Sequence, residues 1–237
     1  MFSASVRQGS VILRDQASVL GPMITKTKLA CLNCLATEGL RPCSRCKWPG
    51  TDDHEDKQIR CFTFLNMLFS VCSSECEDGM WHLMECAVLS QSETDPNISY
   101  DKETFHLYPC VVPLRLLLLR KNNPSAWRVI DTFMDHNDQR DQDSQAWKLH
   151  ELLVRNFVQR YLNLSFSDDE VRRAIGIIRT NSVKLEQPKV GGEGVAIFPT
   201  YSYANHQCQC NTFTRKVGHS LELVAQVDIR RAGSITF

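Results

Sequence analysis

Four closely spaced pairs of cysteine and histidine residues constrain this chain more than any other feature of its sequence. Eight of the eleven cysteines lie between residues 31 and 86, and seven of these pair at short gaps with one another or with a histidine. The pairs are Cys31-x2-Cys34, Cys43-x2-Cys46, Cys72-x3-Cys76 and His82-x3-Cys86. A short gap matters because two side chains can then reach one ion, at about 2.0–2.3 Å, from a single turn of chain.

Two such pairs supply four ligands and close a tetrahedral site, so four pairs predict two structural zinc sites with no position for water. A disulfide framework is the first alternative. The opening residues 1–7 hold no apolar stretch of signal-peptide length, which favours a compartment where thiols stay reduced. Chance clustering is the second alternative, and four consecutive pairs argue against it. Cys61 lacks a paired neighbour and Cys110 lies in an apolar segment, so neither is expected to be a ligand.

Charge and hydropathy give no strong signal for a nucleic-acid or membrane partner. The chain has 27 basic and 27 acidic residues, so its bulk charge provides no strong signal for binding nucleic acid or an anionic membrane. The longest apolar run, residues 116–119, is far too short to span a bilayer. Because the start of the chain also lacks an apolar stretch of signal-peptide length, we expect a protein of the nucleus, the cytoplasm or both, without a membrane partner.

The remaining sequence predicts helices in the middle and strands at both ends. A polar connector begins at Ser90, and apolar residues then recur at helical spacing from 108 to 178. The side chains expected to pack in the core of these helices are Leu114, Leu117, Leu118, Trp127, Ile130, Phe133, Met134, Trp147, Leu149, Leu152, Leu153, Phe157 and Tyr161. Ser167 and the three acidic residues after it predict a helix start, and the acidic stretch 135–143 predicts a solvated bend.

Short segments rich in β-branched and aromatic residues complete the pattern. The predicted strands lie at 9–14, 17–22, 195–198, 211–215 and 221–225, with a turn at 217–220. The fold class is therefore predicted to be α+β, with β pieces at the two ends of the chain and the cysteine-rich and helical parts between them.

The order of the four pairs, with Trp81 directly before His82, resembles the MYND zinc finger. In that family the first pair binds metal with the third and the second with the fourth. The resemblance implies one zinc held by Cys31, Cys34, Cys72 and Cys76, and another held by Cys43, Cys46, His82 and Cys86. It also implies that the metal contributes the folding energy of the finger and that the finger binds proline-containing peptides.

A second motif lies near the end of the chain. The run Asn205-His206-Gln207-Cys208-Gln209-Cys210-Asn211 resembles the Asn-His-Ser-Cys-x-Pro-Asn signature of SET methyltransferases. A MYND finger that splits a SET domain is the hallmark of the SET-and-MYND (SMYD) family, and the helical middle with Pro113-Leu-Arg-x-Leu-Leu-Leu resembles its arthropod-type branch. The resemblance covers essentially the whole chain and implies SET-type β pieces split by the finger and a helical insertion.

The implied domains are N-terminal SET strands at 1–30, the finger at 31–86, the helical insertion at 87–178 and the SET core at 179–237. Compared with the family, the finger has an insertion at 50–70. In family members the second pair is followed almost directly by the third. Deleting Gly50 to Ser70 would restore the usual spacing. A retained short intron and an ordinary loop, whose closure entropy grows slowly with length, explain this segment equally well.

The activity implied by the resemblance is transfer of a methyl group from S-adenosylmethionine to a lysine side chain of a protein, histones included, in transcriptional or chromatin regulation. By motif matching, Asn181, Ser202, Asn205 and His206 would contact the cofactor. Cys208 matches the ligand of a third zinc, which the full-length family completes with cysteines after the SET core.

Some family features have no match in these 237 residues. The glycine turn of the cofactor site should precede Gly9, and the catalytic tyrosine should follow the 233–236 strand. Gln207 and Cys210 replace the usual serine and proline of the signature. The chain is therefore expected to be truncated at both ends and inactive by itself, with no catalytic residue identified. A non-catalytic, zinc-dependent module that recruits proteins, such as a corepressor, is the alternative function.

Overall fold

Two units make up the chain in the computed structural model, which describes residues 5–23, 29–46, 70–92, 108–140, 145–187, 192–204, 207–230 and 236. One unit combines residues 1–18 with 196–237, and the other is residues 19–195. We call them the terminal unit and the central unit. Both helices and strands are present, so the predicted α+β class is confirmed. The domain boundaries drawn from the sequence stay predictions.

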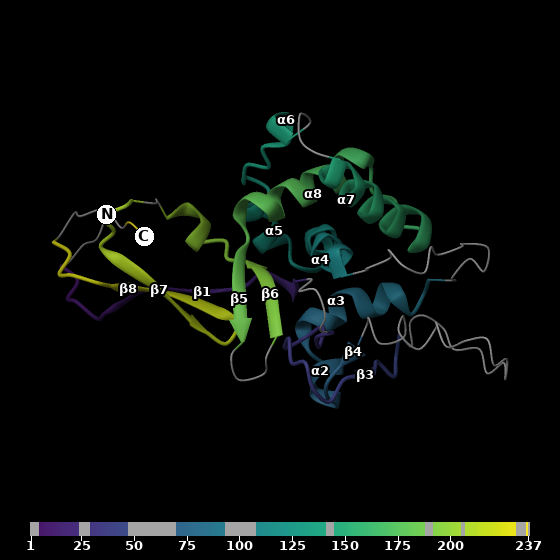
Figure 1. Ribbon diagram of the computed structural model, residues 1–237, viewed down its shortest axis with the longest axis horizontal. Helices are drawn as coiled ribbons and strands as arrows, with labels where there is room; N and C mark the ends of the chain where they lie inside the picture. Colours follow the sequence, from purple (N-terminus) through teal and green to yellow (C-terminus); the bar gives the residue numbers. More distant parts are fainter. Residues whose placement is uncertain are drawn as a thin grey trace. The chain divides into compact units, whose positions relative to one another are not determined.

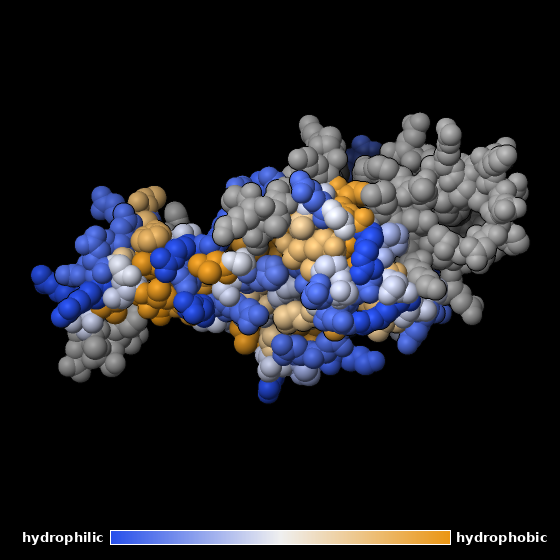
Figure 2. Space-filling model, turned by 90° about the horizontal axis from the view of Figure 1, so that it is seen from below, coloured by the Kyte–Doolittle hydropathy of each residue, from blue (hydrophilic) through white to orange (hydrophobic). Residues whose placement is uncertain are grey.

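The terminal unit contains a three-stranded antiparallel sheet in the order β1-β8-β7. Its strands are β1 (Val11–Gln16), β7 (Thr212–Val217) and β8 (Ser220–Ala225). The hairpin between β7 and β8 turns at Gly218, whose φ of 58° lies in the left-handed region that favours glycine. Two large apolar residues of β7, Phe213 and Val217, are exposed, and Figure 2 shows hydrophobic surface among the hydrophilic side chains of this unit.

Two buried carboxylates organise this unit. Glu222 on the central strand lies between Arg14 of β1 and Arg215 of β7, whose Nε atoms donate to it at 2.8 Å each. Asp15 accepts the backbone N–H of Thr200 at 2.6 Å and that of Tyr201 at 2.8 Å. It thereby anchors the start of the 3-10 helix Tyr201–Tyr203 to the sheet.

The central unit combines a second sheet, the cysteine-rich region and the helices. The sheet has the order β2-β6-β5, with strands β2 (Val19–Pro22), β6 (Gly192–Ile197) and β5 (Val183–Gln187). The cysteine-rich region contains β3 (Arg41–Pro42), β4 (Ser70–Val71), α2 (Ser74–Glu77) and α3 (Met80–Leu89). The helices predicted between 108 and 178 are α4 (Tyr108–Asn122), α5 (Pro124–Ile130), α6 (Asn137–Arg140), α7 (Gln145–Arg155), a π-helix (Asn156–Tyr161) and α8 (Asp168–Asn181).

Helix α4 is the centre of this unit. It packs against β2, α3, α5, α7 and α8, and Figure 1 shows it between α3 and the layer formed by α7 and α8. Every residue from Cys110 to Leu119 is buried, including Arg115. Because the helix is covered on nearly all sides, the buried arginine must find its hydrogen-bond partners inside the protein.

Pro113 lies inside α4 and is accommodated by a neighbouring helix. A proline has no N–H, so the carbonyl four residues earlier loses its helical donor. That carbonyl belongs to Pro109, and Nε2 of His150 on α7 lies 3.4 Å from it. Burial lowers the pKa of His150, which favours the neutral ring at this position.

Glycines in β6 allow the sheet to approach the first cysteine turn. A Cβ on Gly192 would lie 1.6 Å from the carbonyl oxygen of Leu35, and one on Gly194 would lie 2.6 Å from that of Gly21. Leu35 follows the first cysteine pair and has a φ of 67°. Close backbone contact therefore joins the sheet to this turn.

Three side chains predicted to be core are exposed. Met134, Leu149 and Leu152 have exposed fractions of 70%, 57% and 42%. On α7 the buried face instead follows Trp147, Glu151 and Val154, at a spacing of four and then three residues. The prediction was wrong for Leu149 and Leu152 because these two residues lie on the opposite side of α7 from Trp147, Glu151 and Val154.

Other local predictions fare differently. The helix start at Ser167 is confirmed: its side chain accepts the N–H of Glu170, and the carboxylate of Glu170 accepts the N–H of Ser167. The bend predicted at 135–143 needs a correction, because residues 137–140 form helix α6, while the irregular residues 135–136 before it include Asp135, which pairs with Arg173 at 2.9 Å. Residues 47–69 lie outside the described part, so both interpretations of the insertion stay predictions.

Candidate metal centres

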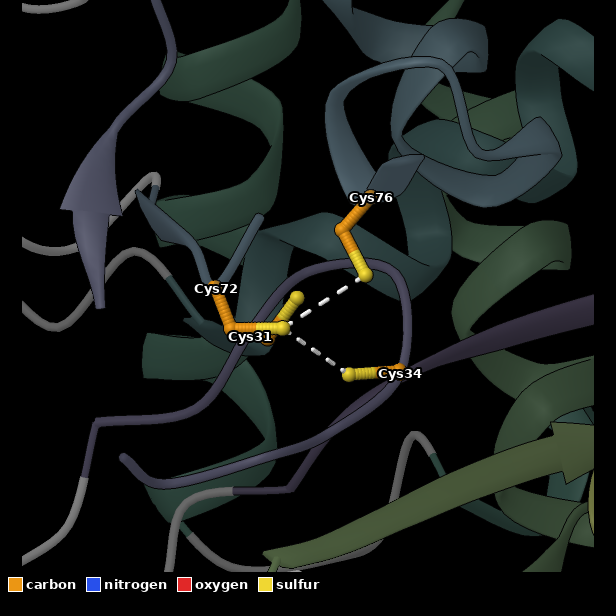
Figure 3. A group of neighbouring side chains, drawn as sticks. All are labelled: Cys31, Cys34, Cys72 and Cys76. Atoms are coloured by element: carbon orange, nitrogen blue, oxygen red, sulfur yellow. Dashed lines mark hydrogen bonds between the residues drawn. The ribbon is translucent and has the colours of Figure 1, made fainter. Parts of the chain in front are cut away.

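The first ligand group consists of Cys31, Cys34, Cys72 and Cys76, whose sulfur atoms all lie within 4.8 Å of one another. Figure 3 shows the four thiols pointing toward one centre. The Sγ atoms of Cys34 and Cys72 are 3.4 Å apart, and those of Cys72 and Cys76 are 3.5 Å apart. Four sulfurs at about 2.3 Å from a tetrahedral zinc would be separated by about 3.8 Å, so this group fits the ion with little movement.

The second ligand group consists of Cys43, Cys46, His82 and Cys86, again within 4.8 Å of one another. The Sγ atoms of Cys43 and Cys86 are 3.8 Å apart, and the Sγ of Cys46 lies 3.9 Å from Nε2 of His82. All four residues are buried, whereas Cys34 and Cys72 of the first group are partly exposed.

The two groups interleave along the chain. The first group joins residues 31–34 to residues 72–76, and the second joins residues 43–46 to residues 82–86. These are the combinations implied by the MYND resemblance. Each group could therefore bind a zinc ion through four protein ligands and would leave no open coordination position.

Local backbone geometry places the first cysteine pair. The N–H of Cys31 donates to the carbonyl of Ala36 at 2.7 Å, and the N–H of Leu35 donates to the carbonyl of Cys31 at 3.0 Å. The N–H of Ala36 also donates to the thiol of Cys34. Such N–H donors stabilise a thiolate, which is the form that binds metal.

In the second pair, backbone N–H groups also donate to a cysteine thiol, and here they lower its pKa. Burial raises the pKa of the Cys43 thiol, but the N–H groups of Cys46 and Arg45 and the nearby ring of His82 outweigh it and lower the pKa to about 7. Burial raises the pKa of Cys72 in the first group and of Cys86 in the second to about 11 each. A pKa of about 7 means that about half of the Cys43 thiol is ionised at neutral pH before any metal binds.

Side chains around the ligands connect the two groups. Asn33 donates to the Sγ of Cys76 at 3.7 Å and accepts the N–H of Trp81 at 3.3 Å. The carboxylate of Glu77, next to Cys76, accepts the N–H of Ser44 at 3.0 Å and its hydroxyl at 2.8 Å, and it also pairs with Arg41. A residue beside a first-group ligand therefore holds the turn that carries the second cysteine pair.

His82 has a buried carboxylate behind it. Its Nδ1 lies 3.3 Å from Oε1 of Glu85, while its Nε2 faces the second ligand group. Burial lowers the pKa of His82, but the carboxylate of Glu85 more than compensates, so the net shift is upward. Sequence reasoning missed this partner, although its position three residues after the histidine on one helix was a usable signal.

The proposed cofactor contacts lie apart from these groups in sequence. Nδ2 of Asn181, at the end of α8, donates to the carbonyls of Met134 and Ile177. The hydroxyl of Ser202 donates to the carbonyl of Phe198 at 2.9 Å. Asn181 belongs to the central unit and Ser202 to the terminal unit. Asn205 and His206 lie outside the described residues.

The predicted ligand of a third zinc, Cys208, is exposed. Within the described part of the chain, Cys208 does not belong to a group of side chains that could hold a metal. The nearby Cys210 has its Sγ 4.0 Å from Oε1 of Gln226. The role of Cys208 in binding metal stays a prediction that rests on the resemblance.

An α+β protein with two closed, thiol-rich ligand groups is the class that this fold and site define. No protein-family model matches the chain. The chain is similar to histone-lysine N-methyltransferase ASHR1 of Arabidopsis thaliana, with 20% identity over 218 residues. The similar region includes 89% of this chain and 41% of the plant protein, so the chain spans less than half the length of this relative. Among the described residues, none of the helices is both long and apolar enough to cross a membrane.

Proposed function

We propose that this chain is a zinc-stabilised part of a protein-lysine methyltransferase of the SET-and-MYND type. The observation that carries the proposal is the pair of interleaved ligand groups in a chain that is similar to a histone-lysine N-methyltransferase over most of its length. Each zinc would cross-link two segments that are far apart in sequence, so metal binding would supply folding energy to a region with little regular structure.

Zinc is the metal that suits these donors. Seven of the eight ligands are cysteine sulfurs and the eighth is an imidazole nitrogen. Soft thiolates in tetrahedral groups select zinc over calcium, magnesium or manganese, which prefer oxygen ligands. With four protein ligands at each site the ions are structural, and neither takes part in a reaction.

Methyl transfer would be the activity of the whole protein. The reaction is an in-line displacement in which a neutral lysine amine attacks the sulfonium methyl of S-adenosylmethionine, and the protein contributes orientation and exclusion of water. We propose that Asn181, Ser202, Asn205 and His206 contact this cofactor and that the protein acts in the nucleus, the cytoplasm or both. Histones would be among its substrates.

One observation favours a second function, a non-catalytic recruiter. Met80 and Leu83 on α3 have exposed fractions of 52% and 41%, although both are large apolar residues. They lie on the same helix as the ligands His82 and Cys86. Zinc binding would hold this helix in place and present an apolar surface to a proline-containing peptide.

Native mass spectrometry of the whole chain tests the zinc proposal, with an expected result of two zinc ions per molecule. One ion or none would contradict it. Calorimetry with S-adenosylmethionine, on this chain and on the complete protein, separates the two functions. Binding and lysine methylation by the complete protein support the methyltransferase, whereas a complete protein that binds two zinc ions and no cofactor supports the recruiter.

A further inference from the structure

A buried arginine from outside the cysteine-rich region contacts a carboxylate inside it. Arg115 on α4 and Glu85 on α3 both have fully buried side chains. The guanidinium donates through Nε to Oε2 of Glu85 at 2.7 Å and through Nη2 to Oε1 at 2.5 Å. This two-pronged contact matches the planar geometry of both groups and fixes the carboxylate in one orientation.

The same guanidinium holds two backbone segments. Nη2 also donates to the carbonyl of Leu32 at 2.9 Å, and Nη1 donates to the carbonyl of Leu20 on β2. Leu32 lies between Cys31 and Cys34, so this bond reaches the turn that supplies the first ligand group. Arg115 thus connects that turn, the sheet and Glu85 from one side chain.

Glu85 passes this connection to the second ligand group. Its Oε1 faces Nδ1 of His82 at 3.3 Å, and the opposite ring nitrogen faces the thiol of Cys46 at 3.9 Å. A carboxylate at Nδ1 keeps the proton on that nitrogen and leaves a lone pair on Nε2, the arrangement that a metal-binding histidine requires. The carboxylate also increases the basicity of the ring as a ligand.

From this geometry we propose that Glu85 and Arg115 are positioning residues for the two zinc sites. Glu85 orients His82 for the second site, and Arg115 holds both Glu85 and the Leu32 turn of the first site. The affinity of both sites for zinc therefore depends on α4, which lies outside the cysteine-rich region. This inference rests on the proposed zinc binding.

A purely structural ion pair would behave differently. Removing one partner of a buried ion pair destabilises a fold whatever the metal ligand is, so a loss of stability alone gives no evidence of a metal-specific role. If Glu85 is a positioning residue, the loss of zinc affinity on its substitution should depend on the ligand at position 82. The loss should occur with histidine, whose Nδ1 needs a partner, and not with cysteine, whose side chain has no ring nitrogen.

The test uses the 237-residue chain and measures zinc affinity by competition with a chromogenic chelator, together with native mass spectrometry and the visible spectrum of the Co²⁺-loaded protein. Glu85→Gln keeps the shape of the side chain and removes its charge. We expect it to lower zinc affinity at the second site by about 10- to 100-fold, to shift the Co²⁺ absorption of that site, and to leave the first site unchanged.

The His82→Cys background supplies the decisive control, because a cysteine ligand has no ring for Glu85 to orient. There we expect Glu85→Gln to change zinc affinity less than about twofold. An equal loss in both backgrounds would overturn the proposal and assign Glu85 to the fold alone. Arg115→Lys keeps the charge but cannot form the two-pronged contact, and we expect it to weaken both sites, whereas Arg120→Gln on the same helix should weaken neither.

The outcomes separate this inference from the function on which it rests. If the unmodified chain binds two zinc ions and Glu85→Gln binds both with unchanged affinity, the positioning role is wrong and the zinc proposal stands. If the unmodified chain binds no zinc, both are wrong. Because Glu85→Gln alone can decide the question, a failure of Arg115→Lys to fold does not remove the test.

Discussion

The two ligand groups have nearly the same internal geometry and very different surroundings. In both, four ligand atoms lie within 4.8 Å of one another. The first group has only sulfur ligands, and Cys34 and Cys72 are partly exposed. The second group is buried throughout and has a histidine backed by Glu85 and Arg115.

Ligand spacing and ligand environment are therefore separate properties. The spacing shows which two ligands one turn of chain can bring to the same ion. The environment determines how easily water, protons and competing ligands reach them, and how much of the surrounding core depends on the metal. We therefore expect the first site to exchange its metal more readily and the second to matter more for stability.

The largest expected effect comes from removing one ligand at each site. Cys86→Ser and Cys34→Ser should each lose one of two zinc ions, because the groups do not share ligands. Cys86→Ser should destabilise the chain by about 4 kcal/mol or more, because it leaves buried polar groups without a metal. Cys34→Ser should cost less, because water can reach its site. Native mass spectrometry and thermal unfolding measure both; loss of both ions in either variant would contradict independent sites.

A chelator should next distinguish the sites by rate. With excess chelator at neutral pH, we expect zinc to leave the first site at least several-fold faster than the second, because its partly exposed thiols are open to attack. Time-resolved native mass spectrometry should show a one-zinc species. Cys34→Ser, which keeps only the second site, should lack the fast phase. A fast phase that persists in that variant would show that exposure does not set the rate.

Peroxide should show the same order through covalent chemistry. The sulfurs of Cys34 and Cys72 are 3.4 Å apart, close enough to form a disulfide once zinc has left. Two thiolates would give two electrons to hydrogen peroxide, which takes up two protons and leaves as two water molecules. Because Cys34 and Cys72 are partly exposed and the second group is buried, peptide mapping should find this disulfide before any oxidation in the second group. The buried Cys110, which peroxide cannot readily reach, should stay reduced and serves as an internal control.

Removing the link between the groups should have a moderate effect. Hydrogen bonds from the N–H and hydroxyl of Ser44, together with Arg41, hold the pKa of Glu77 below its usual value. A lowered folded pKa means that Glu77 stabilises the fold above its unfolded pKa of about 4.3 and that this contribution is lost as pH falls through the folded pKa. Glu77→Gln should therefore cost about 2 kcal/mol at pH 7.

The pH dependence provides the check on Glu77. Urea unfolding of both proteins at several pH values should show a difference that shrinks below about pH 4.3, where the Glu77 carboxyl of the unfolded wild-type chain begins to bind a proton while the folded one is still ionised. Comparing two proteins at each pH cancels the loss of zinc that acid causes in both. A constant difference down to pH 3 would mean that the charge of Glu77 does not contribute.

The smallest expected effect is a control far from both groups in sequence. Ser167→Ala removes the side-chain cap that accepts the N–H of Glu170 at the start of α8. We expect a loss of about 1 kcal/mol in the free energy of unfolding, with two zinc ions still bound and unchanged chelator kinetics. A change in the chelator kinetics would show that zinc release depends on global unfolding, and it would contradict the expectation that local exposure sets the different rates of the two sites.

Much of the local structure was predictable because its causes are local. The capping box at Ser167, the hairpin around Gly218 and the helices after residue 108 follow from short-range patterns that chemistry dictates within a few residues. The exposed Leu149 and Leu152 show where this reasoning fails. A helix buries the face that its neighbours cover, and an apolar spacing alone does not say which neighbours those are.

The amino-acid sequence shows which two ligands can reach one ion from a single turn, because the two members of each pair are at most four residues apart. Which pairs combine followed from the MYND resemblance, and the structure brings those pairs together. Other features depend on the packing of distant segments: the partial exposure of Cys34 and Cys72, the burial of the second group, and the placement of Arg115 against Glu85, thirty residues away. Burial and long-range hydrogen bonds arise only when remote parts of the chain pack together, so no local pattern could have revealed them.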